Sequence, residues 1–219
     1  MDSRSARKHQ AILEAATAVF LDKGYAGTSM DDIARLAAVS KQTVYKHFAD
    51  KEKLFAEIVL ATTDRVEGVI DLVSDIPADA AGLEAELTRV AGEFLRALTQ
   101  PQVLRLRRLI IANADAFPEL GASWYRQGFE RGLASLAGSF RRLAEQGLLR
   151  IDDPMLAADH FAGLLLWIPV NQAMFTGGPV HTEAELDHYA EAGVRVFLAA
   201  YRTPAPPASR PPLPSTATA

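Results

Sequence analysis

The chain has 219 residues, of which 49% are hydrophobic, and a formal net charge of −4. This is enough apolar material for a substantial core. The absence of cysteine excludes disulfides, thiolate metal sites and cysteine catalysis. The start, MDSRSARKHQ, is polar, and the longest apolar stretch, 161–170, is too short to cross a bilayer, so we expect a cytoplasmic protein without membrane contact.

The charge is unevenly divided along the chain. Residues 1–55 carry nine Lys or Arg against seven Asp or Glu, a net charge of +2. Residues 56–219 carry fourteen against twenty, a net charge of −6. This asymmetry favours a small head that faces nucleic acid, on an acidic body.

The segment 28–48 predicts two short helices joined by a tight turn. Thr28 and Ser29 are good N-caps for the first helix, and Ser40 can cap the second, over about 41–48. The outer face of this second helix consists almost entirely of hydrogen-bond donors, which suits the major groove of DNA. The donors are Lys41, Gln42, Thr43, Tyr45, Lys46 and His47. The pattern is that of a helix-turn-helix.

Roles follow from position on this predicted recognition helix. Lys41, Gln42 and Thr43 stand at its N-terminal end, where base edges are reached; Gln42 can pair with adenine and the Thr43 methyl with thymine. Thr28 and Lys51 stand at helix N-termini, where they can share one phosphate. Further phosphate contacts are expected from Tyr45, Lys46 and His47. The tyrosine and histidine could instead be packed or solvated.

Strand signals are nearly absent from the rest of the chain. Helical periodicity predicts an all-α fold of nine helices, three in an N-terminal helix-turn-helix head and six in a C-terminal body. We expect a DNA-binding domain at 1–55, an effector-binding and dimerisation domain at 56–202, and a disordered Pro/Ala-rich tail at 203–219. The body helices are expected at about 50–74, 79–99, 101–115, 119–146, 154–175 and 183–202.

The N-terminal pattern resembles the TetR/AcrR family of transcriptional regulators. It covers about residues 10–55 and departs from the family at Ala38, where a turn glycine is usual. If that position needs a positive φ, alanine costs on the order of 1 kcal/mol. The matching residues are Phe20, Gly24, Tyr25, Thr28, Ile33, Ala34, Val39, Ser40, Thr43, Tyr45, Phe48, Lys51 and Leu54.

The body resembles the AefR-like subgroup of this family more weakly. The similarity lies in 109–111 and 116–120, with Asn113 where the subgroup often has glutamate. The resemblance implies a homodimer on double-stranded DNA with a pseudo-palindromic operator. It also implies that the long helix from Asp50 couples ligand occupancy to the tilt of the head.

A cluster of aromatic and amide side chains is the candidate effector site, for a small hydrophobic or amphipathic compound. Aromatic residues at helical spacing can also be plain core. Arg105, Arg107 and Arg108 could meet an anionic effector or be solvated or paired. The candidate ligand-binding residues are Asn113, Phe117, Trp124, Tyr125, Phe129, Trp167, Asn171 and Met174.

The last two predicted helices have more apolar surface than one protomer needs, which favours a four-helix dimer interface. Those faces could instead close the core of a single protomer. The candidate interface residues are Phe161, Leu165, Leu186, Tyr189, Val194, Phe197 and Tyr201.

These patterns predict a sequence-specific DNA-binding repressor that a small effector releases from its operator. Alternatives are a regulator without an effector, an activator, or, from another class, a helical enzyme or interaction protein. No nucleophile, P-loop or dinucleotide motif and no paired histidines support an enzyme, so we expect no catalytic site, cofactor or metal.

Overall fold

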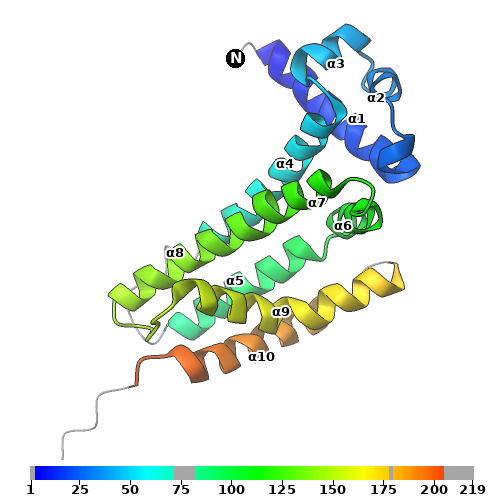
Figure 1. Cartoon of the computed structure of the whole chain (residues 1–219). Helices are drawn as coiled ribbons and strands as arrows, with labels where there is room; N and C mark the ends of the chain where they lie inside the picture. Colours follow the sequence, from blue (N-terminus) through cyan, green and yellow to red (C-terminus); the bar gives the residue numbers. More distant parts are fainter. Residues whose placement is uncertain (1–2, 72–81, 178–179, 205–219) are drawn as a thin grey trace, which may run out of the picture.

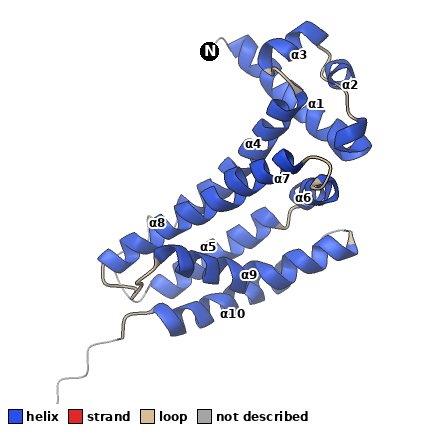
Figure 2. Ribbon diagram, in the orientation of Figure 1, coloured by secondary structure: helices blue, strands red, loops and turns tan. Residues whose placement is uncertain are grey.

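The computed structural model describes residues 3–71, 82–177 and 180–204, and in these ranges the fold is helical without a β-strand (Figures 1 and 2). The head comprises α1 (Ser3–Gly27), α2 (Met30–Leu36) and α3 (Lys41–His47), and α4 (Lys51–Asp71) leads away from it. The body helices are α5 (Leu83–Leu98), α6 (Pro101–Asn113), α7 (Pro118–Trp124), η2 (Tyr125–Glu130), α8 (Arg131–Glu145), α9 (Pro154–Thr176) and α10 (Glu183–Tyr201). The all-α prediction is confirmed.

Local sequence signals set several helix ends. Gly24, with φ of 74°, breaks the helical geometry of α1, and glycine adopts a positive φ at little cost. Ser29 caps α2 and Ser40 caps α3, each through its side-chain oxygen. Thr182 forms a capping box with Glu185 at the start of α10.

The predicted single helix at 119–146 is divided in three. Residues 118–124 form α7, Tyr125–Glu130 form the π-helical turn η2, and α8 begins at Arg131. A π-turn inserts one extra residue per turn and re-aims the side chains around it. No periodicity in the sequence marks such an insertion.

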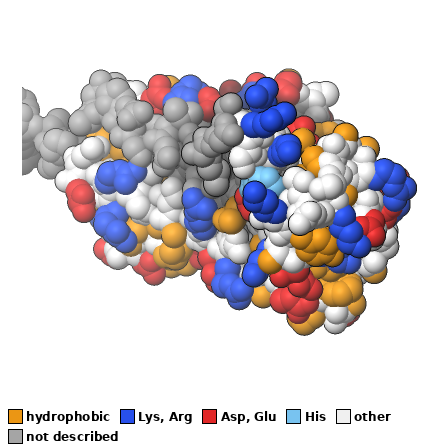
Figure 3. Space-filling model, turned by 90° about the horizontal axis from the view of Figure 1, so that it is seen from above, with side chains coloured by type: hydrophobic (Ala, Val, Ile, Leu, Met, Phe, Trp, Pro, Cys, Tyr) orange, Lys and Arg blue, Asp and Glu red, His pale blue; other side chains and the backbone are white. Residues whose placement is uncertain are grey.

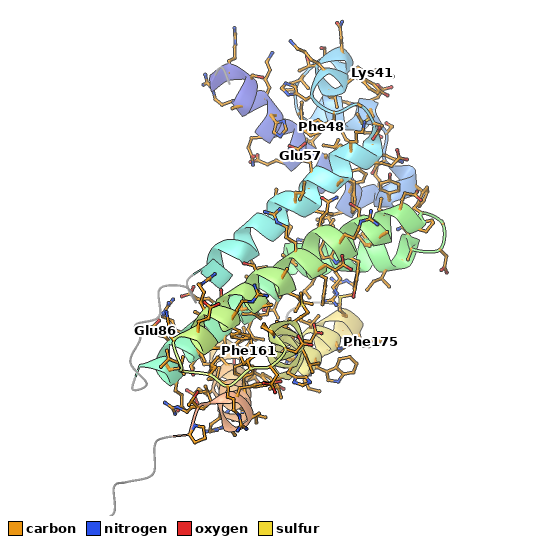
Figure 4. The ribbon with its side chains drawn as sticks, turned by 60° about the vertical axis from the view of Figure 1, so that its left-hand side comes forward. Lys41, Phe48, Glu57, Glu86, Phe161 and Phe175 are labelled. Carbon is orange, nitrogen blue, oxygen red and sulfur yellow. The ribbon has the colours of Figure 1, made fainter. Side chains whose placement is uncertain are left out.

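The body core consists of apolar faces from α5, α8, α9 and α10. Phe140, Phe161 and Phe197 meet at its centre with ring centroids 4.8–5.3 Å apart. Gly193 allows α10 to approach α9 closely, because a Cβ there would lie 2.7 Å from Leu165 Cδ2. Figure 4 shows Phe161 directed among the body helices.

Five residues expected at the dimer interface lie in this core instead. Phe161, Leu165, Leu186, Val194 and Phe197 are each at most 5% exposed in one protomer. Tyr189 and Tyr201 are partly buried against the same core. In this protomer α9 and α10 bury their most apolar faces on α5 and α8, so these side chains close the protomer's own core.

The hydrophobic cluster of the head extends past residue 55. Ile58 and Val59 of α4 belong to the hydrophobic cluster of the head, and so do Leu106, Ile110 and Leu120 from α6 and α7. The helix α4 runs without interruption through the expected boundary. Head and body therefore share one apolar junction.

The end of α10 is held against the link that follows α8. Arg150 N–H donates to Tyr201 O at 2.7 Å, and Thr203 N–H donates to Leu148 O at 3.2 Å. Ordered contacts thus reach residue 203, and 205–219 of the expected tail lie outside the described residues. In the part of the chain that the structure describes, no helix is long and apolar enough to span a membrane.

Candidate nucleic-acid interface and effector cavity

The recognition helix α3 lies at the end of the molecule remote from α10, with Lys41 at its tip (Figures 1 and 4). Val44 and Phe48 are buried, at 0% and 2% exposure, and they anchor the helix in the head core. Lys41, Gln42, Tyr45 and Lys46 are exposed on the opposite side. The predicted donor face is therefore open to a ligand as large as DNA.

The turn between α2 and α3 has a left-handed residue at Ala38. Its φ is 53°, and no other non-glycine residue of the described ranges has a positive φ. An L-residue with a Cβ is strained there by roughly 1–2 kcal/mol. The turn is the glycine type expected from the resemblance, with alanine in the strained position.

Two residues at the start of α3 are already engaged within the head. Lys41 Nζ lies 2.9 Å from an Asp31 carboxylate oxygen, and this hydrogen bond raises the pKa of Lys41. Both side chains are 58% exposed, so the pair contributes little stability and phosphate oxygens can compete for the lysine. The Thr43 and Ser40 hydroxyl oxygens are 2.8 Å apart, which leaves the Thr43 methyl as its apolar contact group.

His47 packs at the edge of the head rather than projecting freely. Its ring lies 5.7 Å from that of His9, which in turn lies 4.8 Å from Phe48. Burial first, and then electrostatic interaction with His9, Lys46 and Lys8, lowers the pKa of His47. The imidazole is therefore mostly neutral at pH 7 and offers a hydrogen bond rather than a charge.

The N-terminal turns of α1 add a basic surface that the site prediction omitted. Arg4, Arg7 and Lys8 are exposed on α1, and His9 and Lys8 place this helix beside α3. Viewed onto the head, Lys and Arg side chains gather around the visible histidine (Figure 3). The signal in the sequence was the mildly basic start of the chain.

Thr28 and Lys51 both have partners inside the protein. Thr28 is 4% exposed, and its hydroxyl donates to Gly24 O at 2.7 Å. Lys51 Nζ donates to Tyr25 O at 2.9 Å and to Thr28 O at 3.2 Å. Both side chains thus hold the turn between α1 and α2, which presents the N-terminus of α2.

A cavity of about 70 Å³ lies where α5, α6, α8 and α9 meet the π-turn η2. A more open groove of about 320 Å³ adjoins it and shares five wall residues with it: Arg107, Phe129, Leu133, Ala162 and Leu166. The cavity lining is otherwise apolar: Phe94, Leu98, Val103, Trp124, Gly128, Gly132, Leu136, Ala162 and Leu166. The groove also has Asp159, Gly163, Trp167, Val170 and Asn171.

Half of the predicted ligand-binding residues line these two spaces: Trp124, Phe129, Trp167 and Asn171. Asn113 instead bonds Leu109 O, and Phe117 packs on the Tyr25 ring in the head–body junction. Tyr125 is 57% exposed and stacks on Phe129 from outside. Met174 packs against the body core.

The three arginines of α6 have different surroundings. Arg105 is exposed, and Arg108 donates to Ala173 O and Gly177 O at the C-terminal end of α9. Arg107 faces both the cavity and the groove, with its guanidinium carbon 5.4 Å from the Phe129 ring centroid. Burial lowers the pKa of Arg107 from its ordinary value.

The outer face of α9 and α10 has exposed apolar side chains. Trp167 is 68% exposed, Ile168 is 50% exposed and Val196 is 55% exposed. Phe175, at 89% exposure, points away from the body in Figure 4. These side chains, rather than the predicted ones, make the unburied apolar surface of the last two helices.

No three His, Asp or Glu side chains gather in a metal-binding arrangement among the described residues. The residues that the sequence marks as ligand-binding candidates do not include the cavity walls from α5 and α8. The sequence left the role of Arg107 open, because its surroundings come from α5, α7, η2, α8 and α9.

Comparisons with known proteins agree with this architecture. Residues 12–58 match the family described as bacterial regulatory proteins, tetR family, and residues 85–203 match the AefR-like transcriptional repressor C-terminal domain. A TetR-family regulator structure from Mesorhizobium loti MAFF303099 is 51% identical, with a TM-score of 0.83 over 92% of this chain and 100% of that one. The flavonoid-responsive regulator FrrA is 31% identical, with a TM-score of 0.72 over 91% of this chain and 100% of its own.

Curated relatives match over shorter stretches. The regulator YdeS of Bacillus subtilis is 38% identical over 93 residues, which are 41% of this chain and 47% of YdeS. The activator FasR of Mycolicibacterium smegmatis is 42% identical over 67 residues, 30% of each chain. The chain thus spans half or less of the length of these curated relatives. The family is one of DNA-binding regulators that act as dimers rather than of enzymes. The chain belongs to the TetR family of bacterial transcriptional regulators, with an AefR-like C-terminal domain.

Proposed function

We propose that this chain is a sequence-specific transcriptional repressor that binds a pseudo-palindromic operator as a homodimer and is released by a small hydrophobic or amphipathic effector. The proposal rests on the two faces of α3. The inner face is anchored by the buried side chains of Val44 and Phe48, and the outer face exposes Lys41, Gln42, Tyr45 and Lys46. A helix held this firmly by its inner face can place its outer side chains on base edges.

Gln42 and the Thr43 methyl are the proposed base contacts. Lys41, Tyr45 and Lys46 are proposed to contact phosphates, and Lys41 exchanges Asp31 for a phosphate when it binds. His47 adds a neutral hydrogen bond. Thr28 and Lys51 support the interface from inside by fixing the turn before α2.

The homodimer is proposed to form through the outer face of α9 and α10. Its exposed apolar residues Leu164, Ile168 and Val196 would be covered by the same face of a second copy. A dimer of this kind presents two recognition helices to successive major grooves, which are roughly 34–36 Å apart. A small rotation of either head spoils this spacing.

The path from the cavity to the head is short. On α6, Val103 and Arg107 face the cavity, whereas Leu106 and Ile110, on another face of the same helix, belong to the head cluster. Trp124 lines the cavity and also packs against the head cluster. A ligand that displaces Trp124 or α6 therefore changes the packing under the head, and two states with different ligand affinity give release.

The relatives support both the effector and the sign of regulation. FrrA is described as flavonoid-responsive, and the repressor SCO4008 of Streptomyces coelicolor is 32% identical over 95 residues. Transcriptional activation is the second candidate function, because the relative FasR is an activator. A promoter fusion in cells with and without the protein distinguishes them.

The test is selection of bound duplexes from a random pool, followed by a salt titration of the selected site. A pseudo-palindrome whose affinity falls steeply with salt supports the proposal. Gln42→Ala should relax the sequence preference at one base pair, whereas Tyr45→Ala should weaken binding to all DNA sequences alike. The control Gln102→Ala, at an exposed position of the body, should change neither the preference nor the affinity. No enrichment at low salt by a folded dimer would overturn the proposal.

A further inference from the structure

The side chain of Arg107 lies at an unusual place for a guanidinium. It lines the boundary between the cavity and the groove, and most of the surrounding side chains are apolar, including Val103, Phe129 and Leu166. Within the described residues it forms no ion pair and no hydrogen bond, and its guanidinium lies over the Phe129 ring. An arginine fork is costly to desolvate without an anionic partner.

The neighbouring arginines show that this arrangement is particular to Arg107. Arg108, one residue along α6, places its guanidinium on the last carbonyls of α9. Arg105 lies on the exposed side, and its Nε donates to Pro101 O at 3.4 Å. Asp159 is the one carboxylate among the described residues of the groove lining, and no ion pair joins it to Arg107 there.

The walls leave space beside this charge. Gly132 lines the cavity and Gly163 lines the groove, and a Cβ added at either would meet no atom within 4 Å. The π-turn η2 supplies Gly128 and Phe129 to the same wall, and such turns occur frequently at functional sites. The space is thus apolar, partly enclosed and bordered by one unpaired cation.

We propose that the effector of this protein is an amphipathic anion, whose apolar body fills the cavity and groove and whose carboxylate or sulfonate oxygens accept hydrogen bonds from the Arg107 guanidinium. The inference rests on the proposed function, because it names the ligand class of the proposed effector site. The Phe129 ring face supports the guanidinium at the border of cavity and groove, where it can donate to such an anion. Asp159 disfavours a ligand whose anionic group would lie at its end of the groove.

The inference is tested without DNA, so that its failure is distinct from failure of operator binding. The probes are 8-anilino-1-naphthalenesulfonate and its neutral counterpart N-phenyl-1-naphthylamine, which differ by the sulfonate and both fluoresce on transfer to an apolar site. Wild-type protein should bind the sulfonate, and octanoate should displace it at lower concentration than octanamide. Arg107→Met should weaken sulfonate binding by about tenfold or more, as loss of a charge-assisted hydrogen bond does.

Two further variants locate the effect. Arg105→Met removes a charge from the exposed side of the same helix and should leave both affinities unchanged within about threefold. Gly132→Leu fills the cavity without meeting a neighbouring atom at its Cβ and should weaken both probes, while its melting temperature shows that it is folded. This variant also distinguishes cavity binding from dye bound on the exposed face of α9.

The result expected is a loss of sulfonate and octanoate binding in Arg107→Met with N-phenyl-1-naphthylamine binding retained. Equal loss of both probes in Arg107→Met would overturn the inference, because the arginine would then act only by shaping the cavity. Binding of the neutral probe alone, or of neither probe, by the wild-type protein would overturn it as well. None of these negative results bears on operator binding, which the duplex selection measures separately.

Discussion

The Lys51 ammonium lies 4.4 Å from the centroid of the Tyr25 ring and donates a hydrogen bond to the carbonyl oxygen of the same residue at 2.9 Å. The first turn of α4 is thereby fixed to the turn between α1 and α2. The Tyr25 ring also contacts Phe117 of the body, at 4.8 Å between centroids. Tyr25 of the head therefore contacts both α4 and the body. Substitutions at Tyr25 and its neighbours test how the head is positioned.

Lys51→Met keeps the apolar stem and removes the ammonium. Loss of two charge-assisted hydrogen bonds is expected to lower the free energy of unfolding by about 1.5–3 kcal/mol, measured by urea denaturation. Operator affinity should fall because the α1–α2 turn loosens. The control Lys53→Met, two residues along α4 on the exposed side, should change stability little.

The salt dependence of binding separates this positioning role from direct phosphate contact. A structural Lys51 leaves the slope of log affinity against log salt unchanged, whereas loss of one phosphate contact reduces its magnitude by about 0.9. Lys46→Met is the positive control for that reduction. A slope change in Lys51→Met with unchanged stability would show that Lys51 contacts DNA directly.

Tyr25→Phe is expected to retain or increase stability. The Tyr25 hydroxyl is buried without a hydrogen-bond partner among the described residues, and burial raises its pKa to about 12. Replacing it by phenylalanine keeps the ring contacts with Phe20 and Phe117 and removes an unsatisfied group, a gain of about 0–1 kcal/mol at neutral pH in urea denaturation. A clear loss of stability would mean that the hydroxyl has a partner, such as bound water.

Ala38→Gly should stabilise the head. The left-handed φ of 53° costs alanine roughly 1–2 kcal/mol, a strain that glycine avoids. Glycine in turn stabilises the unfolded chain by about 0.5–1 kcal/mol of backbone entropy. The free energy of unfolding is therefore expected to rise by about 0.5–1 kcal/mol. Ala37→Gly is the matched control, because Ala37 has a φ of −74° and should only lose stability. Equal destabilisation by both changes would show that the turn does not strain Ala38. Denaturant midpoints measure both.

Asp32 gives the head a defined sensitivity to acid. Hydrogen bonds from Lys23 and then Ser29, with the charge of Arg35, lower the pKa of Asp32 to about 2 from an ordinary value near 4. The stabilisation is therefore present above about pH 4 and is lost as the pH falls towards 2. The stability difference between wild type and Asp32→Asn should shrink over this window, followed by urea midpoints at each pH. Asp22→Asn, exposed on α1, is the control, and a difference that stays constant with pH would contradict the assignment.

Charges on the outer face of α9 and α10 should split the dimer without unfolding the protomer. Ile168→Glu combined with Val196→Glu places two carboxylates at positions that are 50% and 55% exposed in one protomer. We expect monomers by light scattering, with unchanged helical circular dichroism and reduced operator affinity. Ile111→Glu, at 60% exposure on α6, is the control. A surviving dimer would place the interface on another surface.

The head could be predicted from the sequence because its signals are local. Ser29 and Ser40 cap their helices through residues three positions away, and Val44 and Phe48 lie one turn apart on α3. The sequence left the strain at Ala38 open, because it showed only alanine where the family usually has a turn glycine, and the structure gives this residue a φ of 53°. The geometry of the motif therefore depends mainly on residues within it. So does the exposure of four side chains on its second helix: Lys41, Gln42, Tyr45 and Lys46.

Tertiary packing decided which apolar faces of the body helices are buried and which stay exposed. The sequence alone showed that Phe197 and Ile168 lie on apolar helices, and only the packing of α9 and α10 on α5 and α8 buried the first and exposed the second. The surroundings of Arg107 likewise come from residues on α5, α8, α9 and η2 that are far from it in the chain. Helix formation and capping depend on neighbours within one turn, whereas burial and cavity walls depend on which helices meet. The sequence by itself therefore determined the fold class and the pattern of the helix at 41–47, and only the tertiary structure decided which apolar side chains are buried and which residues line the cavity beside Arg107.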